Sequence, residues 1–227
     1  MKTLIIISIC STLLLNCAKQ SPVEPIVPET FNYPLKIGNS WTYKCFEVRA
    51  NLGQYDTIAM PDLTILLVDT MTYQNILFYQ DTALSPWYKP RPSYTGIDTR
   101  SNVVVLSDSI TKAPIISIAM PFSPREGYAW IDSHKVYSQY LNQLIGVEPS
   151  YHSLTKKLDI AVPFGIIVDC WEQEIFSDSL RQTRSNVCYM KTGIGIIKSI
   201  DSAPNRTPSD SGLLYVVSEL RSYNVNP

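Results

Sequence analysis

The stretch NSWTYKCFEVRA at residues 39–50 decides how the rest of the chain is interpreted. Its side chains alternate along an extended backbone, so Trp41 and Tyr43 fall on one face while Phe46 and Val48 fall on the other. Both faces mix apolar and polar residues, which is typical of a strand in a sheet that is partly in contact with water. The glycine and asparagine at its start mark a turn into the strand.

The composition of the whole chain extends this interpretation. Its 14 Tyr, together with many Val, Ile and Thr, favour pleated, half-buried surface over helix. Residues 62–69 with 74–81, and 166–176 with 186–192, are expected to form hairpins. Further strands are predicted at residues 102–106, 114–119, 157–162, 194–200 and 213–223. The sequence therefore predicts one mainly antiparallel all-β domain over residues 35–227.

One segment has the spacing of a short amphipathic helix. Val136, Tyr140 and Leu144 recur at helical intervals, Ser133 is placed to cap the start, and Gly146 stands where a helix would end. Its polar side lacks the Lys and Arg of a membrane-surface helix, so we expect it to pack against the sheet.

The N-terminal residues resemble a bacterial lipoprotein signal peptide. Lys2 supplies a positive charge, a short apolar run follows, and the run ends at Leu14-Leu15-Asn16-Cys17. We expect residues 1–16 to be removed and Cys17 to carry the lipid that attaches the protein to a membrane. The alternative is an ordinary secretory signal in which Cys17 has no such role. Residues 17–34 contain four prolines and are predicted to form an extended tether.

This leader predicts that the protein is located in the bacterial cell envelope. Ala18 follows the cysteine, where an aspartate would resemble an inner-membrane retention signal, so the outer membrane is expected. Whether the domain faces the periplasm or the medium stays open. The 19 Lys and Arg balance the 20 Asp and Glu without forming a basic patch, so nucleic acid is not an expected partner.

Three segments together resemble a group of uncharacterised secreted and lipid-anchored bacterial β proteins, many of them from the Bacteroidetes. Residues 33–43 are similar to the opening pattern "PL..GN.W.Y" of that group, residues 160–170 to "v.vPaGtF..C", and residues 189–198 to "yyakGvGlvk". The closing strand at 218–223 also matches. The resemblance implies an antiparallel fold with a curved sheet or half-open barrel, and it implies no known activity.

The cysteines allow two interpretations. If Cys17 is lipidated, Cys45, Cys170 and Cys188 remain, so at most one bridge can form. A hairpin centred on residue 179 would place Cys170 opposite Cys188, where an oxidising compartment would favour a disulfide. The alternative is that both stay buried free thiols.

Catalytic and metal sites receive little support from the sequence. The two histidines, His134 and His152, have no ligand partner at metal spacing, and no GxSxG element occurs. Glu172 and Glu174 lie beside Trp171 and are candidates for a pair of catalytic carboxylates. Their alternation along a strand is more typical of an exposed polar face. We expect no catalytic residues, no metal and no cofactor.

Binding is the more natural hypothesis. Trp87, Tyr88 and Tyr94 are predicted to lie in a loop stiffened by three prolines. There they would contact an envelope protein, a glycan or a lipid, or else cap an open barrel end. The first expectation is a non-enzymatic binding or assembly module. The second is a carrier or sensor that encloses an apolar ligand in a curved sheet, and the third is an envelope hydrolase.

Overall fold

The computed structural model describes residues 29–51, 54–84, 93–107, 115–138, 143–176, 184–202 and 213–226. These residues form one antiparallel sheet of twelve strands. The strands are β1 (Ser40–Asn51), β2 (Gln54–Tyr73), β3 (Ile76–Leu84), β4 (Ser93–Ile97), β5 (Val103–Ser107), β6 (Ile115–Met120), β7 (Ala129–Ser138), β8 (Gln143–Val162), β9 (Gly165–Phe176), β10 (Arg184–Lys191), β11 (Gly195–Ser202) and β12 (Leu213–Asn224). The predicted antiparallel all-β class is therefore confirmed.

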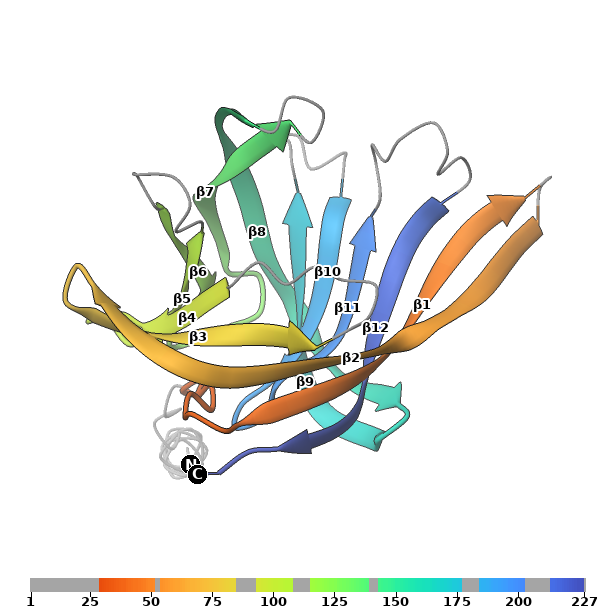
Figure 1. Ribbon diagram of the computed structural model, residues 1–227, viewed down its shortest axis with the longest axis horizontal. Coiled ribbons are helices and arrows are strands. Elements are labelled where there is room, and N and C mark those ends of the chain that lie inside the picture. The colour runs from red at the N-terminus through yellow and green to blue at the C-terminus, as the bar shows by residue number, and fades with distance from the viewer. Residues whose placement is uncertain are drawn as a thin grey trace, which may run out of the picture.

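The first and last strands pair in the middle of the sheet. The strand order is β6-β5-β4-β3-β2-β1-β12-β11-β10-β9-β8-β7, so β1 pairs with β12 while β6 and β7 form the two edges. The sheet curls until these edges approach each other, which gives a barrel that is nearly closed (Figure 1). Because the first and last strands lie side by side, the fold is complete only when both ends of the sequence are in place.

Side chains, rather than a backbone ladder, join the two edge strands. The Trp130 indole N–H on β7 donates to the Ile118 carbonyl on β6 over 3.1 Å, and the Ser117 hydroxyl donates to the Ser133 carbonyl over 2.9 Å. The Ile118 N–H donates to the carboxylate of Asp132. We call this junction the seam.

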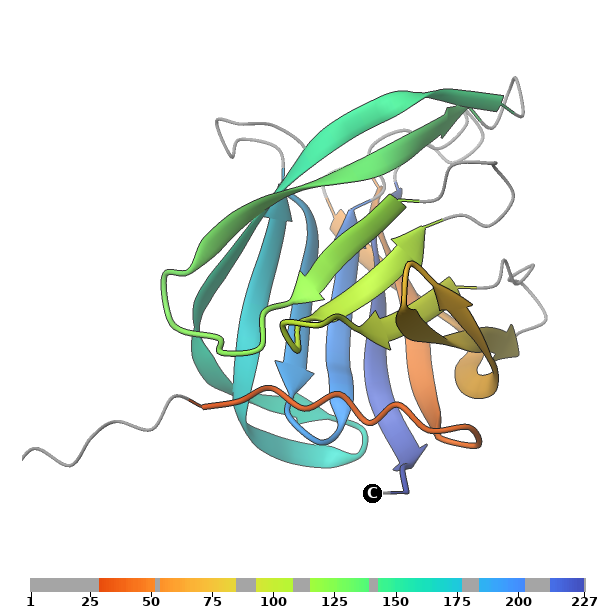
Figure 2. The ribbon, with the colours of Figure 1, turned by 90° about the vertical axis from the view of Figure 1, so that its left-hand side faces the viewer.

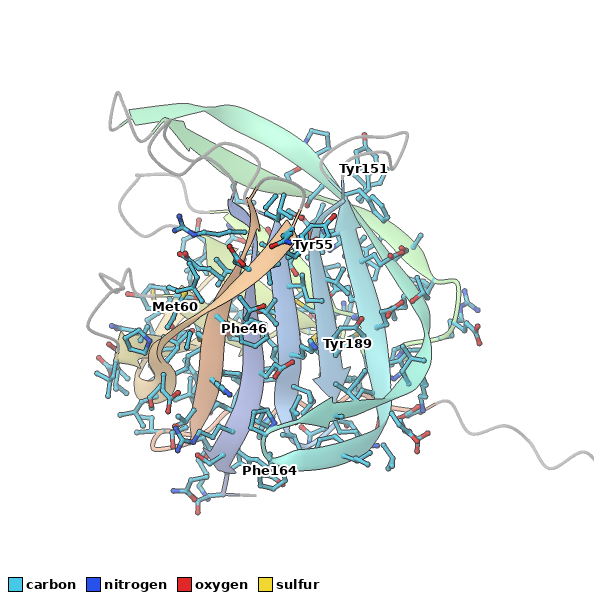
Figure 3. All side chains as sticks on the ribbon, turned by 90° about the vertical axis from the view of Figure 1, so that its right-hand side faces the viewer. Phe46, Tyr55, Met60, Tyr151, Phe164 and Tyr189 are labelled. Carbon is cyan, nitrogen blue, oxygen red and sulfur yellow. The ribbon has the colours of Figure 1, made fainter. Side chains whose placement is uncertain are left out.

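Tight turns link β2 to β3 and β8 to β9. Gln74 and Asn75 have φ of 48° and 62°, and they link Tyr73 to its partner Ile76. Positive φ at both central residues matches the right-handed twist of a two-residue hairpin, and Asn tolerates that conformation. At the β8–β9 turn the Phe164 ring lies against Tyr223, with ring centroids 5.0 Å apart (Figure 3).

The predicted helix over residues 136–145 is not found, and residues on both sides of its centre lie in strands instead. Val136 on β7 pairs with Gly146 on β8, and Tyr137 pairs with Leu144, while residues 139–142 lie outside the described residues. The apolar residues of this segment come in adjacent pairs, which suit a helical stripe and a hairpin equally. The pairing of β8 with β9 favours the hairpin. That pairing cannot be predicted from the residues of this segment alone.

The segment before β1 closes one end of the barrel. It crosses the lower end of the strands in Figure 2 and buries the Phe31 side chain, which is 3% exposed. Thr192 on the β10–β11 turn accepts the N–H of Asn32, and Gly193 donates to the Asn32 carbonyl. The domain packing thus includes residues that the sequence assigns to the tether.

The motif GNSWTY at residues 38–43 holds this closure together. Gly38 adopts φ of 89°, which glycine accepts without strain. The Trp41 indole donates to the Ile194 carbonyl over 2.6 Å, and the Tyr43 hydroxyl donates to the Ile196 carbonyl over 3.1 Å. The motif therefore ties β1 to the β10–β11 turn and to β11, across the intervening strand β12.

Three buried clusters fill the space between the described strands. The Trp41 cluster comprises Trp41, Tyr43, Cys45, Leu67, Ile167, Cys170, Ile197 and Leu220. The Met120 cluster comprises Phe31, Val103, Met120, Leu154, Trp171 and Met190. The Phe78 cluster comprises Phe78, Val104 and Leu106. Beside the last of these, a Cβ at Gly96 would lie 2.7 Å from the Leu77 carbonyl oxygen, so glycine permits the close approach of β3 and β4.

Within the part of the chain that the structure describes, there is no helix of the length and apolar character needed to cross a bilayer.

Candidate functional site

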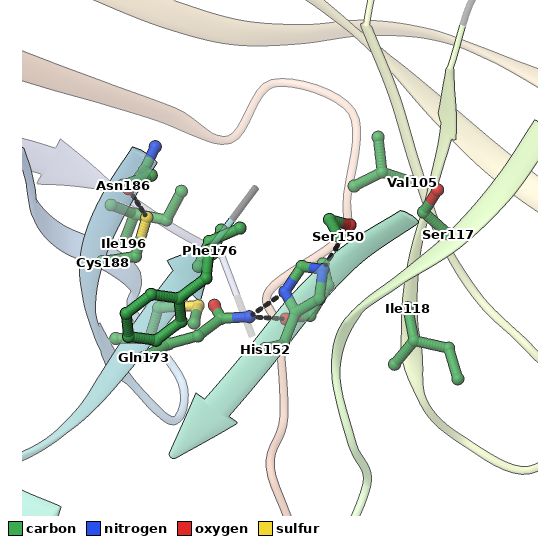
Figure 4. Close-up of a pocket in the computed structure, with 13 residues that line it drawn as sticks. Val105, Ser117, Ile118, Ser150, His152, Gln173, Phe176, Asn186, Cys188 and Ile196 are labelled. Carbon is green, nitrogen blue, oxygen red and sulfur yellow. Dashed lines mark hydrogen bonds between the residues drawn. The ribbon is translucent and has the colours of Figure 1, made fainter. Parts of the chain in front are cut away.

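A cavity of about 470 Å³ lies inside the barrel beside the seam. Strands β5, β6, β8, β9, β10 and β11 contribute its wall (Figure 4). Most of the lining is apolar, supplied by Val105, Ile118, Ile175, Phe176, Met190 and Ile196. Its volume and its apolar lining with a few polar groups are typical of small-molecule sites.

A chain of buried polar groups forms one side of the cavity. Strand β8 presents Ser150 and His152 on the same face, and β9 presents Gln173 toward them. The Ser150 hydroxyl lies 2.9 Å from His152 Nε2, and the Gln173 amide nitrogen lies 3.1 Å from His152 Nδ1 (Figure 4). Trp130 stacks on the imidazole with centroids 4.9 Å apart, which holds the ring in place.

A second polar group lies on β10. The Asn186 side chain donates to the Asp201 carboxylate and accepts the Cys188 thiol proton over 3.1 Å. Burial, reinforced by the negative charge of Asp201, raises the pKa of the Cys188 thiol to about 12. Cys188 therefore stays protonated and unreactive at neutral pH.

Three titratable groups outside the cavity also have raised pKa values. Burial raises the pKa of both Tyr33 and Tyr43 well above the usual range, with neighbouring acidic groups adding to the effect. Burial also raises the pKa of Asp81 to about 6, although hydrogen bonds from Ser93 act in the opposite direction. Tyr33, Tyr43 and Asp81 do not line the cavity.

The structure separates the two cysteines that the sequence could bridge. Cys188 lies opposite Gln173 rather than Cys170, because the β9–β10 register is shifted from the expected one. Among the described residues Cys45, Cys170 and Cys188 are all free thiols. Burial raises the pKa of Cys170 to about 11, so this thiol also stays protonated.

Of the candidate binding aromatics, only Tyr94 lies among the described residues. Tyr94 lies on β4, opposite Leu106, and is half-buried against the Phe78 cluster. Trp87 and Tyr88 lie outside the described residues. Tyr94 is therefore a packing residue.

The polar residues considered for catalysis or metal binding lie apart. Gln173 faces the cavity, so Glu172 and Glu174 on either side of it point to the other face of β9. Glu172 accepts the Thr155 hydroxyl proton over 2.6 Å. Within the described ranges, no three His, Cys, Asp or Glu side chains converge as metal ligands.

Sequence reasoning missed the polar side of the cavity. His152 was considered only as a metal ligand, and Ser150 and Gln173 were not singled out. The available signal was weak: Ser150, His152 and Leu154 share one face of a strand, as do Trp171, Gln173 and Ile175. Only the pairing of β8 with β9 turns these two rows into one site.

A comparison with solved structures finds two bacterial proteins with low sequence identity to this chain. A protein described as a "putative lipoprotein" from Parabacteroides distasonis has a TM-score of 0.49 and 11% identity, covering 86% of this chain and 99% of that one. A "putative exported protein with YmcC-like fold" from Bacteroides fragilis has a TM-score of 0.40 and 11% identity, covering 86% and 100%. No protein-family model matches the chain, and no curated protein does.

Proposed function

We propose that this protein is a carrier or sensor of the cell envelope that binds an apolar small molecule in the barrel cavity. The observation that carries the proposal is the cavity of about 470 Å³, whose wall is mainly apolar and includes the oriented polar groups Ser150, His152 and Gln173. Removing an apolar ligand from water provides the driving force, while the polar groups fix its orientation.

The cavity favours a carrier over the other two expectations. A surface module built on aromatic side chains loses support because Tyr94 packs into a buried cluster. A hydrolase loses support because Glu172 and Glu174 point away from the cavity and Cys188 is held as a thiol. A binding or assembly role remains compatible with the carrier, since a loaded sensor can act through a partner.

Partly filling the cavity should weaken binding. Val105 lines the cavity from β5, and Val105→Phe places a ring in the space that a ligand would occupy. We expect N-phenyl-1-naphthylamine, a neutral fluorescent probe, to bind the wild-type protein and to bind Val105→Phe about tenfold more weakly, because the ring excludes it. Fluorescence titration measures the difference.

Val168→Phe is the matched control, because Val168 on β9 is 53% exposed and does not line the cavity. It should bind the probe like the wild-type protein. Equal affinity in all three proteins would contradict the proposal. If only Val105→Phe binds the probe more weakly, native mass spectrometry of protein purified from envelopes can identify the natural ligand as a copurifying mass.

We also propose that Cys17 carries the lipid that holds the protein at the outer membrane. The apolar run before Cys17 and the proline-rich residues after it support this proposal. Cells fed labelled palmitate should incorporate label into the wild-type protein, and Cys17→Ala should remove it because the acceptor thiol is gone. Equal labelling of both proteins would refute the anchor, and membrane fractionation tests the location.

A further inference from the structure

We infer that the ligand of this cavity carries an uncharged hydrogen-bond acceptor, such as a ketone, ester or amide carbonyl oxygen, which receives the hydroxyl proton of Ser150. The inference rests on the proposed function, because it concerns the same cavity. It follows from the direction in which the buried hydrogen bonds must run.

The Ala119 carbonyl on β6 fixes the direction of these hydrogen bonds. A carbonyl oxygen only accepts, so the Gln173 group 3.0 Å from it must be the amide nitrogen. The same nitrogen lies 3.1 Å from His152 Nδ1 and has a second proton to give. His152 Nδ1 therefore accepts, which fixes the orientation of the amide and the tautomer of the ring together.

The tautomer decides what Ser150 presents. With Nδ1 accepting, the neutral ring carries its proton on Nε2, which donates to Ser150 Oγ over 2.9 Å. The serine oxygen is thus an acceptor in the chain, and its own proton remains to be donated. With the other tautomer, Ser150 would donate to Nε2 and would offer the cavity only lone pairs, which would select a donor.

The Ser150 hydroxyl proton is buried and needs an acceptor. Ser150 is 7% exposed and lines the cavity, and within the described part of the chain His152 is its one hydrogen-bonding partner. A buried hydroxyl without an acceptor is costly. A ligand oxygen placed in the cavity removes that cost, so the protein discriminates in favour of ligands that supply one.

The lining also sets the charge of the ligand. Among the described residues that line the cavity, none has a carboxylate, ammonium or guanidinium group. Asn186, another polar residue of the lining, already contacts Asp201 and Cys188, and the Ser117 hydroxyl donates to the Ser133 carbonyl. An anionic head group would be buried without a counter-charge, which is strongly unfavourable. The site therefore suits a neutral molecule with an apolar body.

Two matched probes test this inference. 2-Acetylnaphthalene and 2-ethylnaphthalene share one ring system and differ in a carbonyl oxygen. Displacement of N-phenyl-1-naphthylamine gives the affinity of each for wild-type protein and for Ser150→Ala. We expect Ser150→Ala to weaken binding of 2-acetylnaphthalene about tenfold and to leave 2-ethylnaphthalene within about twofold, since only the ketone loses a hydrogen bond.

Two further variants separate the role of the hydroxyl from an effect on folding. Ser150→Thr keeps the hydroxyl and should keep the preference for the ketone. Ser117→Ala removes another cavity serine, whose proton is already given to the Ser133 carbonyl, and should affect the two probes equally. If Ser150→Ala does not fold, two tests remain. The first is the Ser150→Thr variant. The second compares ligands on wild-type protein, to which 2-naphthoate should bind more weakly than the ketone.

The outcomes distinguish this inference from the proposed function. If both probes bind and Ser150→Ala weakens them equally, or if 2-naphthoate binds as tightly as the ketone, the inferred ligand chemistry is overturned while the cavity remains a binding site. If no probe binds the wild-type protein, the proposed function and this inference are both overturned. Selective loss of the ketone supports both.

Discussion

Replacing Phe78 by alanine should lower the free energy of unfolding by about 3–5 kcal/mol, the range for truncating a fully buried phenylalanine. Phe78 on β3 is 0% exposed and packs with Val104 and Leu106. The backbones of β3 and β4 already approach closely at Gly96, so the strands cannot collapse easily into the space left behind. Urea unfolding followed by tryptophan fluorescence measures the loss.

The neighbouring residue provides the control for this prediction. Leu77 is 47% exposed on the same strand, so Leu77→Ala removes a similar apolar group from a wet surface. Its effect should stay within about 0.5 kcal/mol. Comparable losses for Phe78→Ala and Leu77→Ala would show that the Phe78 cluster is not a packed core.

Replacing Asn39 by alanine should lower the free energy of unfolding by about 1–3 kcal/mol, because it removes two hydrogen bonds that each contribute about 0.5–1.5 kcal/mol. Asn39 is 0% exposed. Its amide nitrogen donates to the Pro34 carbonyl over 2.8 Å, and its side-chain oxygen accepts the Asn226 N–H over 2.8 Å. One side chain thus joins the segment before β1 to the chain after β12. The same urea experiment measures its contribution.

Asn226→Ala is the matched control for Asn39→Ala. It keeps the backbone N–H that Asn39 accepts and loses a longer side-chain contact of 3.5 Å. Its stability should therefore lie within about 0.5 kcal/mol of the wild-type value. A loss as large as that of Asn39→Ala would mean that the Asn226 side chain, rather than the Asn39 bridge, holds the two ends together.

The positions of most strands could be predicted because alternation is a local property. The expected strands at residues 102–106, 114–119, 194–200 and 213–223 correspond closely to β5, β6, β11 and β12. Errors occurred where a local pattern permits two structures. Paired apolar residues at 136–145 fit a helix as well as a hairpin, and the proline-rich approach to Tyr94 obscured β4.

The candidate site was much less accessible to prediction. Ser150, His152 and Gln173 are ordinary polar residues in their own segments, and nothing in either segment reports the other. The sequence left the choice between a Cys170–Cys188 bridge and free thiols open for the same reason: a symmetric hairpin places Cys170 opposite Cys188, whereas the observed register places Gln173 there. Register depends on the turn and on the packing of both faces.

The sequence by itself determined the class of fold and the positions of most strands, and it predicts the export leader and the turn before the stretch at residues 39–50. These features depend on the period-2 pattern, on composition and on turn residues, all of which act over a few neighbouring positions. The tertiary structure alone decided that β1 pairs with β12, that β6 meets β7 at a seam, and that a polar chain faces an apolar cavity. Those features depend on contacts between residues far apart in the sequence. The energies of such contacts cannot be inferred from any short segment alone.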